Sequence, residues 1–145
     1  MPELIIHGAS SFLGKHFLRK VSKLNLPAII LARQKSLITE FENISSIKIY
    51  RYKNDISELK DLNWSIKGST FIDFAWNGVF GSERNNAEQI TTNIPMVIAS
   101  VQLAHHIGCR HWIGFGSQAE YGNLDKRISE SDVCSPTTLY GKSKW

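Results

Sequence analysis

The chain of 145 residues is long enough for one domain with its own core, but short for an enzyme with separate cofactor and substrate lobes. Its 42% hydrophobic and 21% charged residues are typical of a globular protein and exclude a disordered or fibrous chain. The net charge of +4 comes from 17 basic and 13 acidic residues without a block of like charges, which argues against a nucleic-acid partner and suits a small anionic ligand.

Other features of the composition bear on location. No apolar run approaches the roughly 18 residues of a membrane span, and the first apolar run is too short for a signal peptide. Cys109 and Cys134 have neither metal-ligand nor disulfide-framework spacing and fit a reducing compartment. His105 and His106 have no Cys, Asp or Glu at ligand spacing. We therefore expect a cytoplasmic protein without a metal site or a membrane partner.

Apolar runs and helix-periodic segments alternate along the first half of the chain. A buried strand at Leu4–His7 leads through a glycine turn into a helix from Phe12 to about Leu24. A second buried strand at Ala28–Ala32, ending at Arg33, completes a right-handed crossover unit. Three further segments are expected before the middle of the chain: a helical patch at 37–41, a strand at Ile47–Arg51, and a loop or short helix at 54–62.

The second half continues the alternation. The expected segments are a strand at Thr70–Ala75, a polar loop at Asn77–Asn85, a helix from about Asn86 to Ile107 with a kink at Pro95, a strand at His111–Phe115, a loop at Gly116–Ser135, and a final helix capped by Thr137 or Thr138. Continuous apolar strands that alternate with helices predict an α/β fold. We expect a doubly wound, Rossmann-type parallel sheet in three layers, as one domain over residues 1–145.

Two motifs in this framework can carry chemistry. Gly8 and Gly14 bracket the turn between the first strand and the first helix, where backbone N–H groups can approach a diphosphate; a turn without a ligand is the alternative. Tyr140 and Lys144 lie one turn apart on one helix face, where an ammonium beside a phenol stabilises the phenolate. Such a pair also arises by chance, but here it follows both the glycine turn and Ser117.

This ordered set of motifs resembles the extended short-chain dehydrogenase/reductases, the nucleotide-sugar epimerase/dehydratase family, over essentially all of the chain. The resemblance implies that an NAD(P) cofactor is bound across the carboxyl ends of the strands. The family pattern is G-x-x-G-x-x-G, and Ser11 stands here for its middle glycine, where its hydroxyl could donate to a phosphate. The turn residues that the resemblance assigns to the cofactor are Gly8, Ser10, Ser11, Phe12, Leu13 and Gly14.

The resemblance assigns further cofactor contacts along the chain. Arg33, with no carboxylate through Ser36, can accommodate a 2′-phosphate, which favours NADP(H) over NAD(H); an ordinary surface arginine is the alternative. Asp55 and Ile56 fall at the adenine, where Asp55 can also be a helix N-cap. The remaining assigned contacts are Ala75 and Trp76 in the turn beside the cofactor, unless Trp76 is only core, the mainly structural Asn93, and the pair Tyr140 and Lys144.

The resemblance also implies a mechanism. Tyr140 would exchange a proton with the oxygen of a sugar carbonyl, Ser117 would hydrogen-bond that oxygen, and Lys144 would lower the energy of the phenolate and hold the nicotinamide ribose. Sugar dehydratases of the family have Asp and Glu after the serine. Gln118 and Ala119 stand there, and Glu120 is one position too far along, so we do not expect dehydration.

The amino-acid sequences of these motifs are similar to those of bacterial enzymes that reduce a nucleotide-linked 4-keto-6-deoxysugar for the synthesis of surface polysaccharide. A nucleotide-sugar epimerase that retains its cofactor is one alternative, and a dinucleotide-binding module without activity is another. The expected partner is a nucleotide sugar, and the resemblance leaves room for a homodimer.

Because the chain stops one residue past Lys144, we expect an amino-terminal portion of a longer enzyme, inactive alone and without a carboxyl-terminal substrate lobe. Apolar surface near Trp145 would then promote self-association. A small protein completed by another subunit is the alternative.

Overall fold

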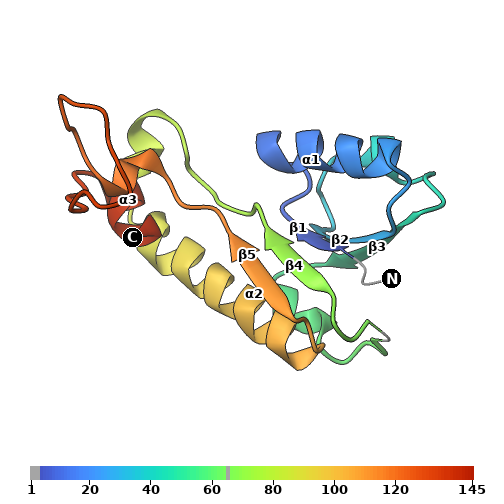
Figure 1. The fold of residues 1–145 in the computed structure, drawn as a ribbon. Coiled ribbons are helices and arrows are strands. Elements are labelled where there is room, and N and C mark those ends of the chain that lie inside the picture. The colour runs from blue at the N-terminus through green and yellow to red at the C-terminus, as the bar shows by residue number, and fades with distance from the viewer. Residues whose placement is uncertain (1–3, 65) are drawn as a thin grey trace. The chain divides into compact units, whose positions relative to one another are not determined.

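Five parallel strands form the centre of the computed structural model of the protein (Figure 1), which describes residues 4–64 and 66–145. The predicted domain also includes residues 1–3 and 65, which lie outside the described residues. The strands, in the sheet order β3-β2-β1-β4-β5, are β1 Leu4–His7, β2 Ala28–Arg33, β3 Ile47–Tyr52, β4 Thr70–Asp73 and β5 His111–Gly114. Since β1 pairs with both β2 and β4, the strand order reverses beside β1, and the predicted doubly wound sheet is confirmed.

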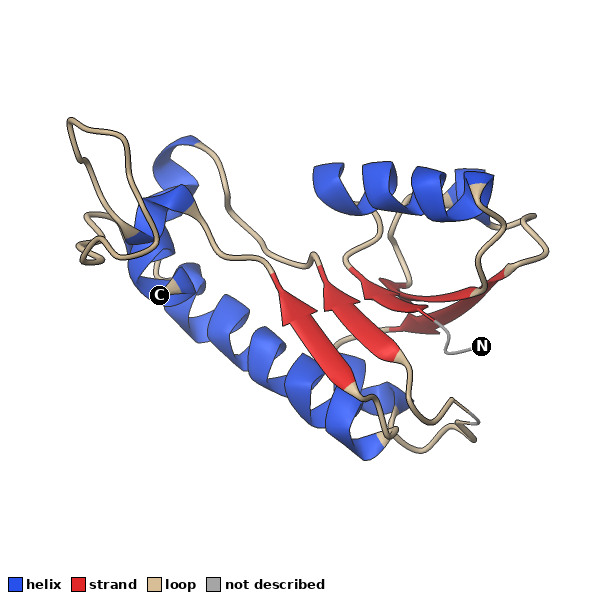
Figure 2. Ribbon diagram, viewed as in Figure 1, coloured by secondary structure: helices blue, strands red, loops and turns tan. Residues whose placement is uncertain are grey.

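The helical elements connect these strands (Figure 2). Three are α-helices: α1 Phe12–Lys23, α2 Ile94–His106 and α3 Leu139–Lys144. Four are 3-10 turns and one is a π-helical turn: η1 Thr39–Phe41, η2 Ile56–Leu59, η3 Gly81–Asn85, the π-helical η4 Gln89–Asn93, and η5 Gln118–Glu120. The helical patch expected at 37–41 and the short helix expected at 54–62 are therefore single 3-10 turns, η1 and η2.

The central strands β2, β1 and β4 are buried on both faces because successive side chains of a strand point to opposite sides, whereas the edge strand β5 is mostly exposed. Ile5 packs with Leu103 and Ile107 of the α2 layer, whereas the next residue, Ile6, packs with Leu18 of the α1 layer. Figure 1 shows α1 on one face of the sheet and the later turns of α2 on the other. The three-layer arrangement follows from this alternation, as the apolar strands predicted.

The long helix expected from Asn86 to Ile107 is wrong at its amino end. The helical segment begins at Gln89 with the π-helical turn, and regular α-helix starts only at Ile94. Pro95 has no N–H to donate to the preceding turn, so the wider turn lies where a regular helix would lack a hydrogen bond. The expected kink is thus a local change of helix type before Pro95.

The fourth strand is shorter than expected, ending at Asp73 instead of Ala75. The Asp73 side chain accepts from the Ala75 N–H at 2.8 Å, and this local hydrogen bond turns the chain out of the sheet. The fifth strand ends at Gly114 instead of Phe115, and the third extends one residue further, to Tyr52.

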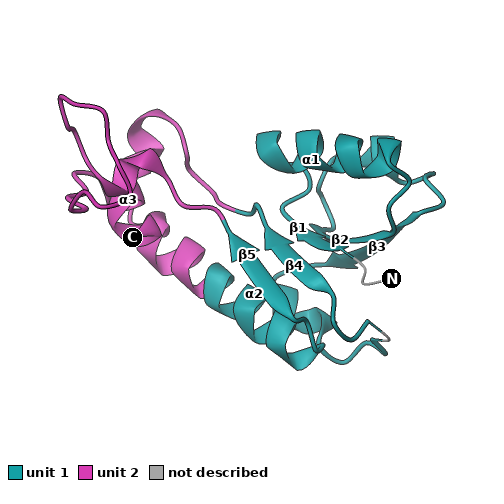
Figure 3. Ribbon diagram, in the orientation of Figure 1, with its two compact units in different colours: residues 1–75, 96–114 teal, residues 76–95, 115–145 magenta. Residues whose placement is uncertain are grey.

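The chain divides into two compact units (Figure 3). Unit 1 consists of residues 1–75 and 96–114 and holds the whole sheet with α1 and most of α2. Unit 2 consists of residues 76–95 and 115–145 and holds η3, η4, η5 and α3. The residues expected to bind the cofactor's phosphates belong to unit 1, and the residues expected to transfer the proton belong to unit 2.

Candidate active site

The turn between β1 and α1 has the shape that a diphosphate site requires. Gly8 has φ +76°, and a Cβ added there would collide with the backbone N of Ala75. Ser11 is the N-cap of α1, where its Oγ accepts from the Gly14 N–H at 3.1 Å. The Ser11 hydroxyl therefore keeps its own proton for a ligand while it occupies the middle glycine position. An anion could approach the backbone at this helix start, and these residues fit a dinucleotide diphosphate.

The first turn of α1 also presents three of the residues assigned to the cofactor. Phe12 is 75% exposed and Leu13 is 51% exposed, although both are apolar, and Ser10 before them is exposed. Their side chains do not contribute to the core, so the turn is available at the surface of unit 1.

The ends of β2 and β3 carry the residues expected around the adenosine. Arg33 is exposed at the last position of β2, and its Nη2 donates to the Met96 Sδ at 3.5 Å. Asp55 caps η2, accepting from the Ser57 N–H at 2.8 Å within a capping box, so the N-cap alternative is confirmed. Ile56, only 1% exposed, belongs to the core on the α2 side of the sheet.

Sequence reasoning missed a buried polar group at the carboxyl ends of the strands. The His7 Nδ1–H donates to Asp73 Oδ1 at 2.9 Å, and the Tyr52 hydroxyl lies 2.8 Å from His7 Nε2. Since the carboxylate fixes the proton on Nδ1, Nε2 is left to accept from the Tyr52 O–H. Polar residues at the ends of apolar strands were the available signal.

The pKa values of two members of this group are shifted. Burial by itself would raise the pKa of Asp73, but the hydrogen bond and charge of His7, helped by weaker hydrogen bonds, hold it below its ordinary value. Burial raises the pKa of Tyr52 against the opposing hydrogen bond and charge of Arg33. The group therefore contains a carboxylate and a neutral phenol, one at each nitrogen of the His7 ring.

In unit 2, Asn93 and Gln89 organise the loop that follows β4. Asn93 is fully buried, and its amide both accepts from the Asn77 N–H and donates to the Asn77 carbonyl, each at 3.0 Å. Gln89, 1% exposed, accepts from the Trp76 Nε1–H at 2.8 Å. These two amides fix the loop backbone and the Trp76 ring.

Helix α3 carries the expected acid/base pair. Thr138 is its N-cap and accepts from the Gly141 N–H at 3.0 Å, as one of the two predicted caps. The Tyr140 ring meets the Trp76 ring edge-on, with centroids 6.0 Å apart at 87°. The Lys144 Nζ donates to the Phe115 carbonyl at 2.7 Å and lies 3.8 Å from the Trp76 ring centroid. Trp76 thus contacts both members of the pair.

Ser117 lies in the turn that packs against α3. A Cβ added to Gly141 would collide with the Ala119 carbonyl oxygen, so only glycine lets α3 come this close to η5. Ser117 is the N-cap of η5, and its Oγ accepts from the Ala119 N–H at 3.2 Å, which leaves its proton for another acceptor. The Glu120 carboxylate accepts from the Ser117 N–H, so it has a structural partner.

The match to a family model decides the family. Residues 4–145 match the NAD dependent epimerase/dehydratase family. The chain belongs to this family. No protein in the curated set matches it.

Several solved enzyme structures share the fold. A UDP-glucose 4-epimerase aligns with a TM-score of 0.79 and 19% identity over 98% of this chain and 44% of that chain. UDP-glucuronic acid 4-epimerase from Bacillus cereus, in complex with NAD, aligns with a TM-score of 0.72 and 20% identity over 98% of this chain and 48% of that chain. The enzyme WbmG from Bordetella bronchiseptica, also in complex with NAD, aligns with a TM-score of 0.77 and 17% identity over 98% of this chain and 46% of that chain. This chain of the epimerase/dehydratase family therefore spans less than half the length of each.

The predicted site residues are divided between the two compact units. The cofactor group in unit 1 consists of Gly8, Ser10, Ser11, Phe12, Leu13, Gly14, Arg33, Asp55, Ile56 and Ala75. Unit 2 holds the predicted catalytic residues Ser117, Tyr140 and Lys144, together with the predicted cofactor contacts Trp76 and Asn93. Sequence reasoning did not single out His7, Asp73 and Gln89, which form buried hydrogen bonds beside these predicted residues.

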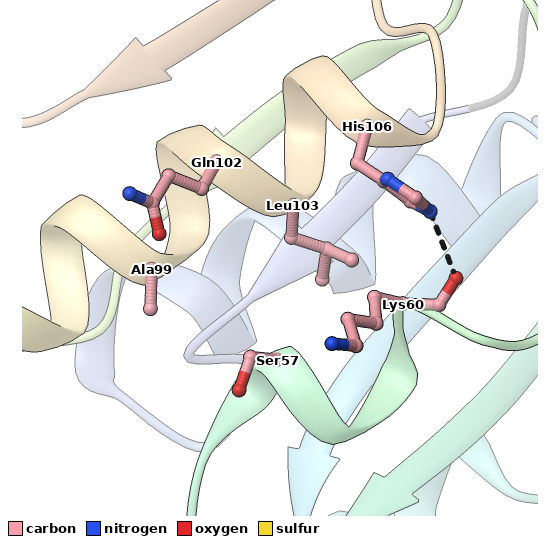
Figure 4. Close-up of a pocket in the computed structure, with 6 residues that line it drawn as sticks. All are labelled: Ser57, Lys60, Ala99, Gln102, Leu103 and His106. Atoms are coloured by element: carbon pink, nitrogen blue, oxygen red, sulfur yellow. Dashed lines mark hydrogen bonds between the residues drawn. The ribbon is translucent and has the colours of Figure 1, made fainter.

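A cavity of about 250 Å³ lies elsewhere, between η2 and α2 (Figure 4). Its wall includes Lys60 and Leu103, and the His106 Nε2–H donates to the Lys60 carbonyl at 3.1 Å. None of the predicted site residues lines this cavity. It is a groove between two helical elements of unit 1.

The described residues were also compared with what a reactive cysteine, a metal site and a membrane-spanning helix require. Both cysteines are free, and burial raises the pKa of the Cys109 thiol to about 11, so this thiol is not an activated nucleophile. Residues 4–64 and 66–145 contain no group of three or more His, Cys, Asp or Glu side chains placed to hold a metal ion. No helix in the same ranges is long and apolar enough to cross a membrane.

Proposed function

We propose that this family member takes part in NAD(P)-dependent oxidation or reduction of a nucleotide-linked sugar, with Tyr140 as the proton carrier. The observation that supports this most directly is the packing of α3 on η5 through Gly141, which holds the Tyr140 helix against the Ser117 turn. The β1–α1 turn, with its exposed start of α1, fits a dinucleotide diphosphate.

Each residue would have a separate task. The Ser117 hydroxyl, whose oxygen already accepts from the Ala119 N–H, would donate its proton to the sugar carbonyl oxygen. Tyr140 would pass a proton to that oxygen during reduction or take it during oxidation. Lys144 would hold the nicotinamide ribose and favour the phenolate. The bound cofactor supplies or accepts the hydride.

The proposed reaction is reduction of a 4-keto-6-deoxysugar. Elimination of water would need carboxyl groups after Ser117, but Ala119 is buried there and the Gln118 amide donates to the Gly122 carbonyl at 3.1 Å. The Glu120 carboxylate is engaged by the Ser117 N–H. With no acid or base for elimination in this turn, hydride transfer to a carbonyl is the chemistry that these residues favour. A role in surface polysaccharide synthesis, a cytoplasmic location and a homodimer belong to the same proposal.

A second candidate is epimerisation of a UDP-sugar. The solved structures that share the fold include UDP-glucose and UDP-glucuronic acid 4-epimerases, the latter bound to NAD. Epimerisation would use the same Ser117, Tyr140 and Lys144 but return the hydride to the other face of the sugar. Reduction consumes one reduced cofactor for each product, whereas epimerisation consumes none.

The test uses the protein at its native length with reduced cofactor and a panel of nucleotide-linked 4-keto-6-deoxysugars and UDP-sugars. Reduction predicts cofactor oxidation in proportion to product, and isomer formation without cofactor oxidation would favour the epimerase. Tyr140→Phe should lose either activity while the matched control Tyr50→Phe, which alters a tyrosine packed against Trp64, keeps it. Cofactor binding without turnover across the panel would leave only a binding module.

A further inference from the structure

The Trp76 ring is the common contact of both residues proposed for proton transfer. Its face lies against the Lys144 ammonium, 3.8 Å from the centroid, and it meets the Tyr140 ring edge-on at 87°. A cation over an indole face is attracted by the ring quadrupole, and Trp gives the strongest such contact among the aromatic residues. The indole therefore does more than fill space next to α3.

Gln89 holds the indole in one orientation. Its Oε1 accepts from the Trp76 Nε1–H at 2.8 Å and from the Asn93 amide at 3.0 Å. Its Nε2 lies within hydrogen-bond distance of three carbonyl oxygens, those of Asn77, Gly78 and Glu83, at 2.6 to 3.2 Å, and its two N–H groups are shared among them. Because Gln89 is buried and its amide is held by the loop carbonyls, rotation of the Trp76 ring would break the hydrogen bond to Gln89 and leave the Gln89 Oε1 with one partner fewer.

The Lys144 ammonium is bound from a second side as well. Its Nζ donates to the Phe115 carbonyl at 2.7 Å while the indole lies under it. A carbonyl dipole and an aromatic face both favour a cation over a neutral amine. The two contacts together set the position of this charge relative to Tyr140, four residues earlier on α3.

We propose that Trp76, oriented by Gln89, is a positioning residue that places the Lys144 cation and the Tyr140 ring for proton transfer. The proposal rests on the function proposed above. It predicts that loss of the indole face releases Lys144 and lowers the rate of the chemical step, with little effect on binding of the nucleotide half of the substrate. If Trp76 served only as a core residue, its replacement would change the stability of the protein and not the rate of the chemical step.

The first experiment measures the contact in the chain itself by NMR with isotope-labelled lysine. The ring current of an indole shifts nearby protons upfield, so the ε-methylene protons of Lys144, identified by their absence in Lys144→Arg, should lie upfield of those of Lys142. Trp76→Leu should remove this shift, and Trp76→Phe should reduce it. Trp112→Phe is the matched control, because its indole donates to Ser100 in unit 1.

The second experiment measures kinetics at native length. Trp76→Leu should lower kcat by at least about 10-fold and displace its pH profile, with KM for the sugar nucleotide changed by less than about 3-fold. An unshifted Lys144 resonance in the wild type, a shift that persists in folded Trp76→Leu, or an unchanged kcat would overturn the proposal. If Trp76→Leu does not fold, Trp76→Phe decides by the same readouts. Retained turnover in Tyr140→Phe would instead overturn the proposed function, which keeps the two failures distinct.

Discussion

The His7 imidazole donates from Nδ1 to Asp73 Oδ1 over 2.9 Å, and both residues are at most 5% exposed. They are the last residues of the neighbouring strands β1 and β4, and they are paired in register. The same carboxylate oxygen accepts from the Ala75 N–H, beside which the Gly8 turn packs. One buried pair therefore joins the ends of two strands next to the Gly8 turn.

Loss of this pair should destabilise unit 1. Asp73→Ala leaves the His7 and Ala75 N–H groups without an acceptor in a buried place, which should lower the free energy of unfolding by about 3 kcal/mol. Chemical denaturation followed by circular dichroism measures this free energy of unfolding. Asp61→Asn, at an exposed aspartate, is the control and should change little. A loss below about 1 kcal/mol in Asp73→Ala would show that the pair contributes little.

The same carboxylate gives stability a pH dependence of known sign. Because the folded pKa of Asp73 is held below its unfolded value, Asp73 stabilises the fold above the unfolded pKa of about 3.9. This contribution disappears as the pH falls through the folded pKa. We expect the wild-type free energy of unfolding to fall more steeply below about pH 4 than that of Asp73→Ala. Parallel curves for the two proteins would contradict this.

Gly141 should be required for the packing of α3 on η5. In Gly141→Ala the new Cβ would collide with the Ala119 carbonyl oxygen, so α3 must shift away from the Ser117 turn. We expect turnover to fall by about 10- to 100-fold, since a displacement near 1 Å can cost that much. Ser143→Ala is the control on the same helix, because its buried hydroxyl has no hydrogen-bond partner among the described residues. Equal activities of the two variants would argue against close packing as the reason for this glycine.

Much of the fold could be predicted from the sequence because continuous apolar strands and the turns between them are local signals. The partners of His7 could not, since Tyr52 and Asp73 lie 45 and 66 residues away and meet it only through the strand order. The π-helical turn before Pro95 was missed for a different reason. Pro95 predicted a kink here, but neither the proline nor the apolar periodicity shows that the turn before it is π-helical.

The candidate site shows the same contrast between local motifs, which the sequence reveals, and contacts that depend on the fold. Tyr140, Lys144 and Ser117 could be proposed as site residues because each stands in a short motif with fixed spacing. Gln89 was missed because a glutamine on a predicted helix has no special spacing, and its role depends on carbonyl groups that a loop turns toward it.

Arg33 gives a prediction on the choice of cofactor. Its guanidinium lies at the end of β2, so Arg33→Ala should weaken NADP(H) binding by about 10-fold or more and leave NAD(H) binding nearly unchanged. Fluorescence titration of the chain with both reduced cofactors measures this. Arg110→Ala, at an exposed arginine just before β5, is the control. Equal affinity of the wild type for the two cofactors, or tighter binding of NAD(H), would overturn the NADP(H) preference, and solved structures with the same fold do hold NAD.

The most direct test of the account is the turnover of Tyr140→Phe at native length, followed by nicotinamide absorbance with a nucleotide-linked 4-keto-6-deoxysugar. The variant keeps the ring that meets Trp76 and loses only the hydroxyl group that would carry the proton. The account predicts cofactor affinity close to that of the wild type and turnover lower by roughly 10²- to 10⁴-fold. Turnover within a few-fold of the wild type would contradict the assignment of Tyr140 as the proton carrier.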